Sequence, residues 1–543
     1  MRPHRREALI GAAASFLAAA SARAASAGPQ VDAPAGLIEG TLEDGIRVFR
    51  GIPYAQPPIG EGRWRPPQPL ARWPGLKKAL RFGPAAPQLK SFPGNVYADD
   101  PPAMSEDCLS LNIWTPPDAR RLPVMVWIHG GALQAGWSGE SIYDGAALAS
   151  RGIVVVTLNY RLGVLGWLAH PELSAESPQG VSGNYGLLDQ IAALRWVQAN
   201  IGAFGGDPSR VTVAGESAGG LSALYLMASP PARGLFHRVI CESGYMISTP
   251  ELKREAHGQP SAESAGLALA RALQAPNLAA LRRLEAGALV VAAARAGFAP
   301  FGVVDGPTLP RQIVETFGRG EQSPVAVLAG FNSGEIRSLR MLAPRPPADP
   351  QAYEAAIRAR YGDLAEAFLR LYPSSNMEES ILATTRDALY AWTAERMVRD
   401  QTRLGLGSFL YEFDHGYPAA DALRLHGFHA SELPYVFGTL DRTPPQWPRP
   451  PATLAERRVS AAMTDYWAGF VASGRPRAPG EPDWPDWGSD MAYMRFGPEP
   501  LVGHHPLPGM FALNDAVVRR RLASGTQAWN WNVGLAAPLP PAT

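Results

Sequence analysis

Cysteine, net charge and long apolar runs are all scarce in this sequence of 543 residues. Two cysteines, Cys108 and Cys241, cannot form a structural zinc site alone, and no histidine cluster has metal-ligand spacing. Both lie in apolar contexts, so we expect buried free thiols, with a disulfide between them as the alternative. Lysine plus arginine (50) nearly balances aspartate plus glutamate (49), which argues against nucleic acid or an anionic membrane as partner. No stretch after residue 24 is apolar enough for a membrane span.

The first 24 residues have the composition of an export signal. Arg2, Arg5 and Arg6 precede an apolar run from Ala8 to Ala20, which is too short to span a bilayer. Ala22-Arg23-Ala24 then offers a small-x-small cleavage site. We therefore expect residues 1–24 to be a signal peptide and the protein to be periplasmic or secreted. The paired arginines leave open twin-arginine export.

Alternating strand and helix patterns predict a mostly parallel sheet with helices on both faces. Gly152–Tyr160 is a nearly continuous apolar run, as expected of a strand buried on both faces, and Leu187–Asn200 has a helical pattern. No linker divides residues 25–543, so we expect one catalytic domain. Helical insertions at about 250–320 and 340–405 are expected to cover the site, with packing on the rim as the alternative. The other predicted strands are Pro123–Ile128, Arg210–Ala214, Arg238–Glu242, Pro324–Ala329 and Ser408–Phe413.

Ser217 lies at the centre of the strongest catalytic pattern. A β-branched run, Val211 to Val213, leads into Gly215-Glu216-Ser217-Ala218-Gly219, and the helix-compatible segment Leu221–Met227 follows. Glycines on either side allow the tight turn that such a serine needs, because neighbouring backbone comes too close for side chains. The turn sets the hydroxyl at a helix N-terminus, where developing negative charge is stabilised. Ser217 is therefore the predicted nucleophile.

A serine nucleophile needs a base and an orienting acid, and in a strand–turn–helix site the chain order is serine, acid, histidine. His429, in a loop well past the last predicted strand, is the predicted base, and His426 is its main rival. Glu335 follows a predicted strand in a loop of small residues and is the predicted acid. Asp305 precedes that strand and suits a turn better. The other downstream histidines are His415, close to a strand end, and His504 and His505, in a predicted polar turn.

Ester cleavage places negative charge on the former carbonyl oxygen, and backbone N–H groups aimed at that oxygen are worth about 3 kcal/mol each. The turn supplies one such group from Ala218. The loop His129-Gly130-Gly131-Ala132 follows an apolar strand and supplies others, with Gly131 and Ala132 best placed. This chemistry calls for no metal and no cofactor.

These motifs together resemble the type-B carboxylesterase family, the cholinesterase and carboxylesterase group of the α/β-hydrolase fold. The resemblance covers nearly the whole mature chain and implies that fold, with a central, mostly parallel sheet and helical insertions over the site. The motifs that carry it are F-R-G-I-P-Y-A at 49–55, E-D-C-L-S-L-N at 106–112, H-G-G at 129–131, N-Y-R-L-G at 159–163, G-N-Y-G-L-L-D-Q at 183–190, F-G-G-D-P at 204–208, G-E-S-A-G-G at 215–220, N-S-G-E at 332–335, H-A-S-E at 429–432 and Y-W-A-G-F-V-A-S-G at 466–474.

The resemblance also implies roles for particular residues. It assigns Ser217, His429 and Glu335 to a catalytic triad that works through an acyl-serine intermediate. The implied oxyanion-hole donors are Gly130, Gly131, Ala132 and Ala218, and the implied structural ion pairs are Arg161–Asp189 and Arg63–Glu106.

The sequence departs from the family pattern at four places. Ala86 stands where the usual disulfide partner of Cys108 would lie, which agrees with a free thiol. Ala132 replaces the third glycine of the usual H-G-G-G, and Leu133 replaces a frequent aromatic residue, which changes the shape of the pocket. Gly334 replaces the acidic neighbour of the acid in the common D-E segment.

We therefore expect an exported serine hydrolase, a carboxylic-ester hydrolase acting on small-molecule esters. A specialised esterase for a bulky natural ester, such as a toxin, feruloyl or polyester substrate, and an amidase are the alternatives within hydrolases, because the insertions set the shape of the pocket. A binding module of the same fold is the alternative from another class. It is least favoured because Ser217, Glu335 and His429 are all present.

Overall fold

The computed structural model describes residues 28–529 and 534–540. The predicted export signal, residues 1–24, lies outside the described residues. Within the described ranges, no helix combines the length and the apolar character that a membrane crossing requires.

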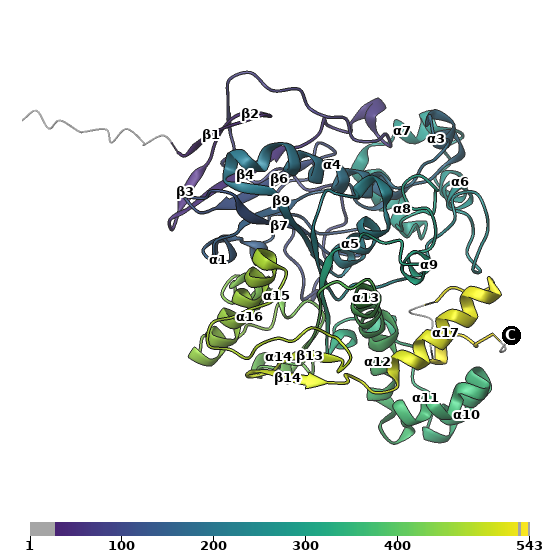
Figure 1. Cartoon of the computed structure of the whole chain (residues 1–543). Coiled ribbons are helices and arrows are strands. Elements are labelled where there is room, and N and C mark those ends of the chain that lie inside the picture. The colour runs from purple at the N-terminus through teal and green to yellow at the C-terminus, as the bar shows by residue number, and fades with distance from the viewer. Residues whose placement is uncertain (1–27, 530–533, 541–543) are drawn as a thin grey trace, which may run out of the picture.

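A mixed sheet of 11 strands forms the centre of the molecule (Figure 1). Its strands in chain order are β3 (Thr41–Glu43), β4 (Ile46–Pro53), β6 (Ser110–Thr115), β7 (Leu122–Ile128), β8 (Val154–Leu158), β9 (Gly206–Glu216), β10 (Arg238–Glu242), β11 (Ala326–Asn332), β12 (Ser408–Phe413), β13 (Ala492–Phe496) and β14 (Pro500–His504). Their spatial order is β14-β13-β12-β11-β10-β9-β7-β8-β6-β4-β3. All neighbours from β8 to β13 are parallel, and the pairs beyond them are antiparallel. The predicted mostly parallel sheet is confirmed. A separate sheet joins β1 (Gln30–Ala33), β2 (Gly36–Glu39) and β5 (Leu76–Lys78).

Helices cover both faces of this central sheet. The framework helices are α1 (Ala146–Ala149), α2 (Gly163–Trp167), α3 (Pro171–Glu176), α4 (Tyr185–Asn200), α5 (Ala218–Ala228), α14 (Pro418–Ala422), α15 (Leu433–Phe437), α16 (Leu454–Ser473) and α17 (Met510–Ser524). In Figure 1, α4 and α5 lie on one side of the sheet, and α1, α15 and α16 lie on the other.

The side-chain alternation of β7 explains this layering. Val124, Val126 and Ile128 belong to the core that includes the apolar residues of α4 and α5. Met125 and Trp127 belong to the core that includes those of α15 and α16. Because successive side chains of a strand point to opposite faces, an unbroken apolar run gives the sheet two buried faces.

The two segments expected to be helix-rich hold eight α-helices in the described residues. The first contains α6 (Ala262–Ala272), α7 (Leu278–Arg282), α8 (Ala286–Arg295) and α9 (Ile313–Gly318). The second contains α10 (Pro350–Tyr361), α11 (Ala365–Leu371), α12 (Met377–Arg386) and α13 (Trp392–Arg403).

The strand prediction is wrong at the C-terminal edge of the sheet. It stops at β12, whereas β13 and β14 extend the sheet by two further strands. His504, expected in a polar turn, is the last residue of β14 and pairs with Ala492. β13 alternates buried and more exposed positions, and β14 buries only its first residue, Pro500, so neither strand has the continuous apolar run of the central strands.

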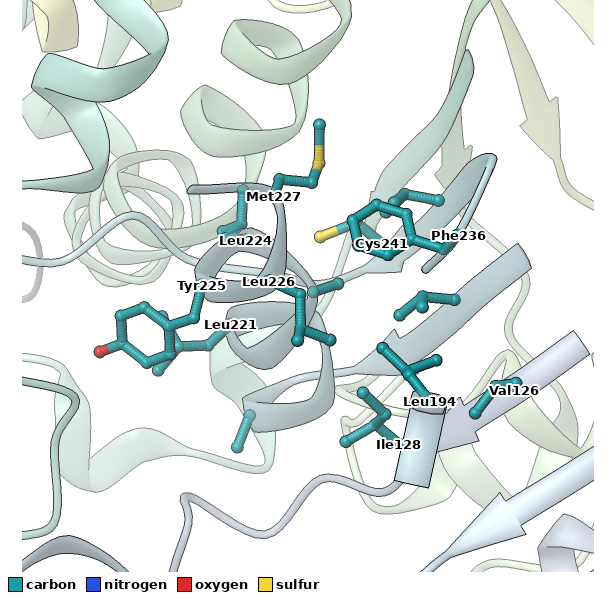
Figure 2. Packing of buried hydrophobic residues seen from close by; sticks show 14 of the residues in the cluster. Val126, Ile128, Leu194, Leu221, Leu224, Tyr225, Leu226, Met227, Phe236 and Cys241 are labelled. Atoms are coloured by element: carbon teal, nitrogen blue, oxygen red, sulfur yellow. The ribbon is translucent and has the colours of Figure 1, made fainter. Parts of the chain in front are cut away.

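Helix α5 is buried along its whole length and packs on the sheet through large apolar side chains (Figure 2). Leu226 points toward Ile128 of β7 and Leu194 of α4. Cys241 of β10 lies in the same cluster, and both it and Cys108 are buried and free, so the free-thiol prediction is confirmed. Burial raises the pKa of both thiols. This packing fixes the N-terminus of α5, where Ser217 lies.

Candidate active site

Ser217 lies in a strained turn between β9 and α5. Its φ is 56° and its ψ is −117°, a conformation that is unfavourable for a residue with a side chain. Its N–H donates to the carbonyl oxygen of Glu242, at 2.9 Å. A Cβ on Gly215 would lie 2.6 Å from the carbonyl carbon of Gly219, and a Cβ on Gly219 would overlap the carbonyl oxygen of Ile128. The structure therefore has the tight turn that the sequence predicts.

Glu335 follows the end of β11 and is fully buried. Its Oε1 accepts hydrogen bonds from the Ser243 hydroxyl, at 2.6 Å, and from the Asn332 N–H, at 2.8 Å. Its Oε2 contacts Nδ1 of His429. Because both carboxylate oxygens are engaged, Glu335 holds one ring nitrogen of His429 in a fixed direction.

Two tyrosines flank the His429 imidazole. The Tyr97 and Tyr390 rings lie 6.3 and 5.2 Å from it, between ring centroids. The Tyr97 hydroxyl also donates to the carbonyl oxygen of His429, at 3.0 Å. Sequence reasoning missed both, because Tyr97 lies in a loop without periodic pattern. Ser243 carried a usable signal, since it follows β10 at the carboxyl edge where Ser217 and Glu335 also lie.

Ser217 and His429 line the same cavity, but no hydrogen bond joins their side chains. Nε2 of His429 lies instead 3.1 Å from Oε1 of Glu216. Burial, and then the charge of Glu335, raise the pKa of Glu216 far above its ordinary value. Catalytic hydrogen bonds between a serine and its base are often formed only when substrate binds.

The alternative acid and bases lie elsewhere. Asp305 accepts the N–H groups of Thr308 and Leu309, as a turn residue does. None of the other downstream histidines contacts Glu335 in the described part of the chain. His415 lies against Glu456, His426 lies against Asp414 and Asp421, and His504 lies against the carbonyl oxygen of Asp490.

The loop after β7 lies directly beside Ser217. A Cβ on Gly130 would lie 3.3 Å from Cβ of Ser217. Ala132 has a φ of 55°, and neither it nor Gly131 has an acceptor for its N–H within the described ranges. Ala218 is the first residue of α5, where an N–H has no partner within the helix. Backbone donors from two elements therefore surround the nucleophile.

A cavity of about 490 Å³ opens in front of Ser217. Its walls are mostly apolar and include Phe301 from the first helix-rich segment and Met341 and Tyr390 from the second. No lysine or arginine is among its described lining residues. Burial raises the pKa of one lining carboxyl group, that of Glu140, to about 8. The carboxylic acids that line the cavity are Asp99, Asp100, Glu140 and Glu216.

Both ion pairs implied by the family resemblance are present. The guanidinium of Arg161 lies 2.7 Å from Asp189, with both side chains buried. Arg63 lies 2.6 Å from Glu106. In the part of the chain that the structure describes, no group of three histidine, cysteine, aspartate or glutamate side chains is arranged as metal ligands.

Comparison with known proteins agrees with this geometry. Residues 27–509 match the model of the carboxylesterase family. The chain is 36% identical to the fumonisin B1 esterase of Sphingopyxis macrogoltabida over 479 residues, which are 85% of each protein. It is 36% identical to the para-nitrobenzyl esterase of Bacillus subtilis (strain 168), over 81% of this chain and 89% of that protein.

Solved structures extend the likeness to three dimensions. A PNB esterase structure superposes with a TM-score of 0.77 at 33% identity, covering 89% of this chain and 99% of its own. A carboxylesterase of Geobacillus stearothermophilus gives a TM-score of 0.76 at 31% identity, with the same coverage. With a family match that spans most of its length, the chain belongs to the carboxylesterase family, whose α/β-hydrolase fold it shares, and is a serine esterase that hydrolyses carboxylic esters.

Proposed function

We propose that Ser217, His429 and Glu335 form the catalytic triad of this esterase. The observation that carries the proposal is the buried contact between Glu335 and Nδ1 of His429, which leaves Nε2 on the side of the cavity that Ser217 shares. The order of these residues along the chain and the strained turn at Ser217 support the same roles.

In this mechanism Nε2 of His429 accepts the proton of the Ser217 hydroxyl while the serine oxygen attacks the ester carbonyl. Glu335 keeps the Nδ1–H tautomer in place and stabilises the imidazolium that forms. The alcohol leaves with the proton from Nε2, and an acyl-serine remains. A water molecule then gives a proton to the same nitrogen and attacks the acyl carbon, and the acid is released as that proton passes to the oxygen of Ser217.

We assign oxyanion stabilisation to the N–H groups of Gly131, Ala132 and Ala218, together with that of Gly130. The N–H groups of Gly131 and Ala132 have no acceptor within the described ranges, and Ala218 lies at the first position of α5. Donors that are held in place before the reaction stabilise the tetrahedral oxyanion without reorganisation in the transition state.

We further infer that the substrate is an uncharged ester of a small molecule. A cavity of about 490 Å³ has the size of ordinary small-molecule sites, and its apolar walls suit uncharged groups. Asp99 and Asp100 at its wall oppose an anionic ester. The relative named fumonisin B1 esterase keeps an esterase for a bulky natural ester as the second candidate.

We also propose that the protein is exported, on the pattern of residues 1–24 alone. Determining the N-terminus of the mature protein after expression in a host with signal peptidase tests this. Cleavage near residue 24 is expected, and an intact N-terminus would contradict it.

Ser217→Ala tests the mechanism. The pure variant should lose hydrolysis of p-nitrophenyl acetate and butyrate and should no longer react with a fluorophosphonate probe. Ser460→Ala is the control, because Ser460 is a buried serine of α16 that bonds the carbonyl oxygen of Tyr435 and does not line the cavity. Wild-type rates in Ser217→Ala would refute the mechanism. Comparing p-nitrophenyl butyrate with the anionic mono-p-nitrophenyl succinate tests the substrate charge.

A further inference from the structure

His426 lies three residues before the proposed base, and the mechanism above does not use it. The loop between α14 and α15 that carries both histidines contains three residues with positive φ, which are Arg424 at 57°, His426 at 50° and Ala430 at 65°. Such conformations are unfavourable for residues with side chains, so surrounding interactions must hold this loop in place.

This loop packs directly against the loop that carries the proposed acid. The N–H of Gly334 donates to the carbonyl oxygen of Gly427, at 2.8 Å, and Nδ2 of Asn332 donates to that of Phe428, at 2.8 Å. A Cβ on Gly334 would lie only 2.7 Å from the carbonyl oxygen of Leu425. A displacement of residues 425–428 therefore changes the position of the base relative to the acid.

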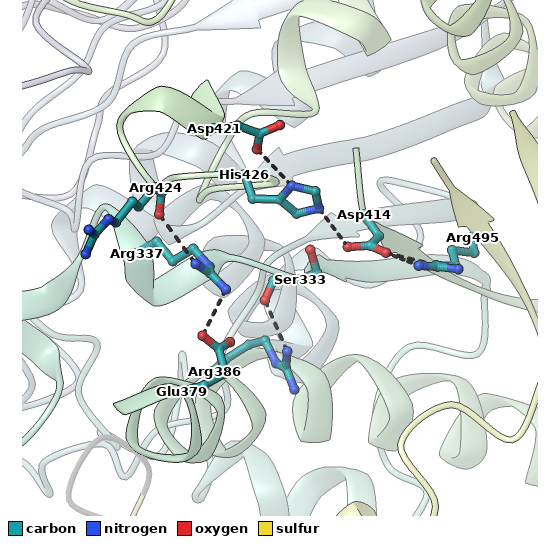
Figure 3. Close-up of polar contacts among 9 residues, drawn as sticks. All are labelled: Ser333, Arg337, Glu379, Arg386, Asp414, Asp421, Arg424, His426 and Arg495. Atoms are coloured by element: carbon teal, nitrogen blue, oxygen red, sulfur yellow. Dashed lines mark hydrogen bonds and ion pairs between the residues drawn. The ribbon is translucent and has the colours of Figure 1, made fainter. Parts of the chain in front are cut away.

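The imidazole of His426 lies between two carboxylates, as Figure 3 shows. Nδ1 is 3.0 Å from Oδ1 of Asp421, in α14, and Nε2 is 3.2 Å from Oδ1 of Asp414, which follows β12. A neutral imidazole carries one N–H, so only the imidazolium donates to both carboxylates. The hydrogen bond to Asp414, and then that to Asp421, raise the pKa of His426 in spite of its partial burial.

Gly416 provides the space that the His426 ring occupies. A Cβ on Gly416 would overlap Nδ1 of His426 and would lie 2.6 Å from Oδ1 of Asp421. Gly416 is not among the residues of positive φ, so its own backbone accommodates alanine. The ring and its carboxylate partner are what exclude a side chain at this position.

The other charged groups of the cluster come from three more parts of the fold, which are β13, the segment after β11 and α12 (Figure 3). Nε of Arg495, in β13, donates to Asp414 at 3.0 Å, and this bond, with that from His426, lowers the pKa of Asp414 in spite of its burial. Arginine and carboxylate groups ordinarily titrate outside about pH 6 to pH 9, and histidine titrates within this range. The remaining charged residues of the cluster are Arg337, which bonds Glu379 and the Arg424 carbonyl oxygen, and Arg386, which bonds the Ser333 carbonyl oxygen.

We propose that His426, as an imidazolium bridging Asp414 and Asp421, is a positioning residue that holds the loop of the base against the loop of the acid. The inference rests on the proposed triad. A histidine whose pKa is raised in the folded protein contributes fully below its ordinary value, and its contribution is lost as the pH rises through the raised pKa. Wild-type kcat should therefore fall on the alkaline side, while KM, which depends on the cavity, should change little.

The first test is the pH profile of His426→Asn. Asparagine tolerates positive φ and removes both the charge and the titration. We expect kcat for p-nitrophenyl acetate to fall roughly threefold to tenfold near pH 7, as for a half-exposed charged hydrogen bond, and the alkaline fall to disappear. His504→Asn is the matched control, because His504 is exposed on β14, and its profile should equal that of the wild type. The same alkaline midpoint in His426→Asn and wild type would overturn the proposal.

A double-mutant cycle with Gly416 gives an independent test. Gly416→Ala should displace the ring and reproduce the loss in kcat, and in a His426→Ala background it should add no further loss. Independent, additive losses from the two substitutions would overturn the proposal. Failure of the triad itself gives a different result, because Ser217→Ala would then retain activity whatever residue stands at 426.

A direct titration completes the set. Following the ring protons of His426 by NMR in the whole enzyme should give a midpoint above the ordinary value of about 6.5, equal to the alkaline midpoint of kcat. The protection of the backbone amides in residues 424–430, measured as exchange relative to the intrinsic rate at each pH, should fall above that midpoint in the wild type. A midpoint at or below the ordinary value would overturn the proposal.

Discussion

The hydroxyl of Ser243 supports the acid of the proposed triad, and its removal should reduce turnover without weakening substrate binding. Glu335 is fully buried, so no bulk water replaces a lost donor. In Ser243→Ala, Oε1 of Glu335 still accepts the hydrogen bond from the Asn332 N–H, but it loses the hydrogen bond from the Ser243 hydroxyl, at 2.6 Å. A hydrogen bond to a charged group contributes about 1.5–3 kcal/mol.

A change of about 1.4 kcal/mol in the barrier corresponds to tenfold in rate. If the transition state loses the whole contribution of this hydrogen bond and the bound substrate loses none, kcat should fall roughly tenfold to a hundredfold. KM should stay within about threefold, because Ser243 is not among the residues that line the cavity. The assay is steady-state hydrolysis of p-nitrophenyl acetate at a pH above the acid limb of the profile.

Two further variants separate the hydrogen bond from other effects. Ser243 has a φ of 47°, so Ser243→Gly removes the hydroxyl and relieves the backbone, and it should show the same loss as Ser243→Ala. Ser460→Ala removes a buried hydroxyl that bonds the Tyr435 carbonyl oxygen and does not line the cavity, and its kcat should match the wild type. A kcat within about twofold of wild type in both Ser243 variants would refute the reasoning.

Three other substitutions test the site and its support. Asp189→Asn leaves the buried Arg161 guanidinium without its carboxylate and should lower the free energy of unfolding in urea by about 3–5 kcal/mol, whereas a loss below about 1 kcal/mol would contradict this. Gly219→Ala should lower kcat roughly a hundredfold or prevent folding, because its Cβ would overlap the Ile128 carbonyl oxygen, while Gly202→Ala, with nothing near its Cβ, should behave as wild type. Glu216→Gln should keep kcat within about threefold near pH 7, because burial and the charge of Glu335 raise the pKa of Glu216 and so favour the neutral carboxyl group, which glutamine resembles. A large loss of kcat at neutral pH would show that Glu216 acts as a charge.

Much of the fold could be predicted because the central strands are bounded apolar runs. The bounds of β10 and β12 agree with the sequence at both ends. β11 ends three residues later than predicted, because residues 330–332 continue to pair with β12. β13 and β14 could not be found in this way, since β13 is only partly buried, the edge strand β14 is mostly exposed, and the pairing of β13 with β12 joins distant parts of the chain.

The residues of the proposed site likewise fall into those that the local sequence predicts and those that it does not. Ser217 and Glu335 could be predicted because each follows a recognisable strand, and small residues mark the tight turns. Position along the chain favours His429 over His426 only weakly and the family resemblance strengthens that choice, since both lie in one loop and differ by contacts formed through tertiary structure. Tyr97 and Tyr390 reach His429 from segments whose local sequence carries no sign of that contact.

The joined loops of acid and base have a consequence for protein engineering by recombination. Residues 332–335 and 425–428 interlock through the bonds of Gly334 and Asn332, with no room for a side chain at position 334. A chimera that receives the histidine loop of a relative without its acid loop would combine surfaces that are not shaped for each other. The two segments therefore form a single unit of exchange, although some 90 residues separate them along the chain, and crossover points between them should yield inactive libraries.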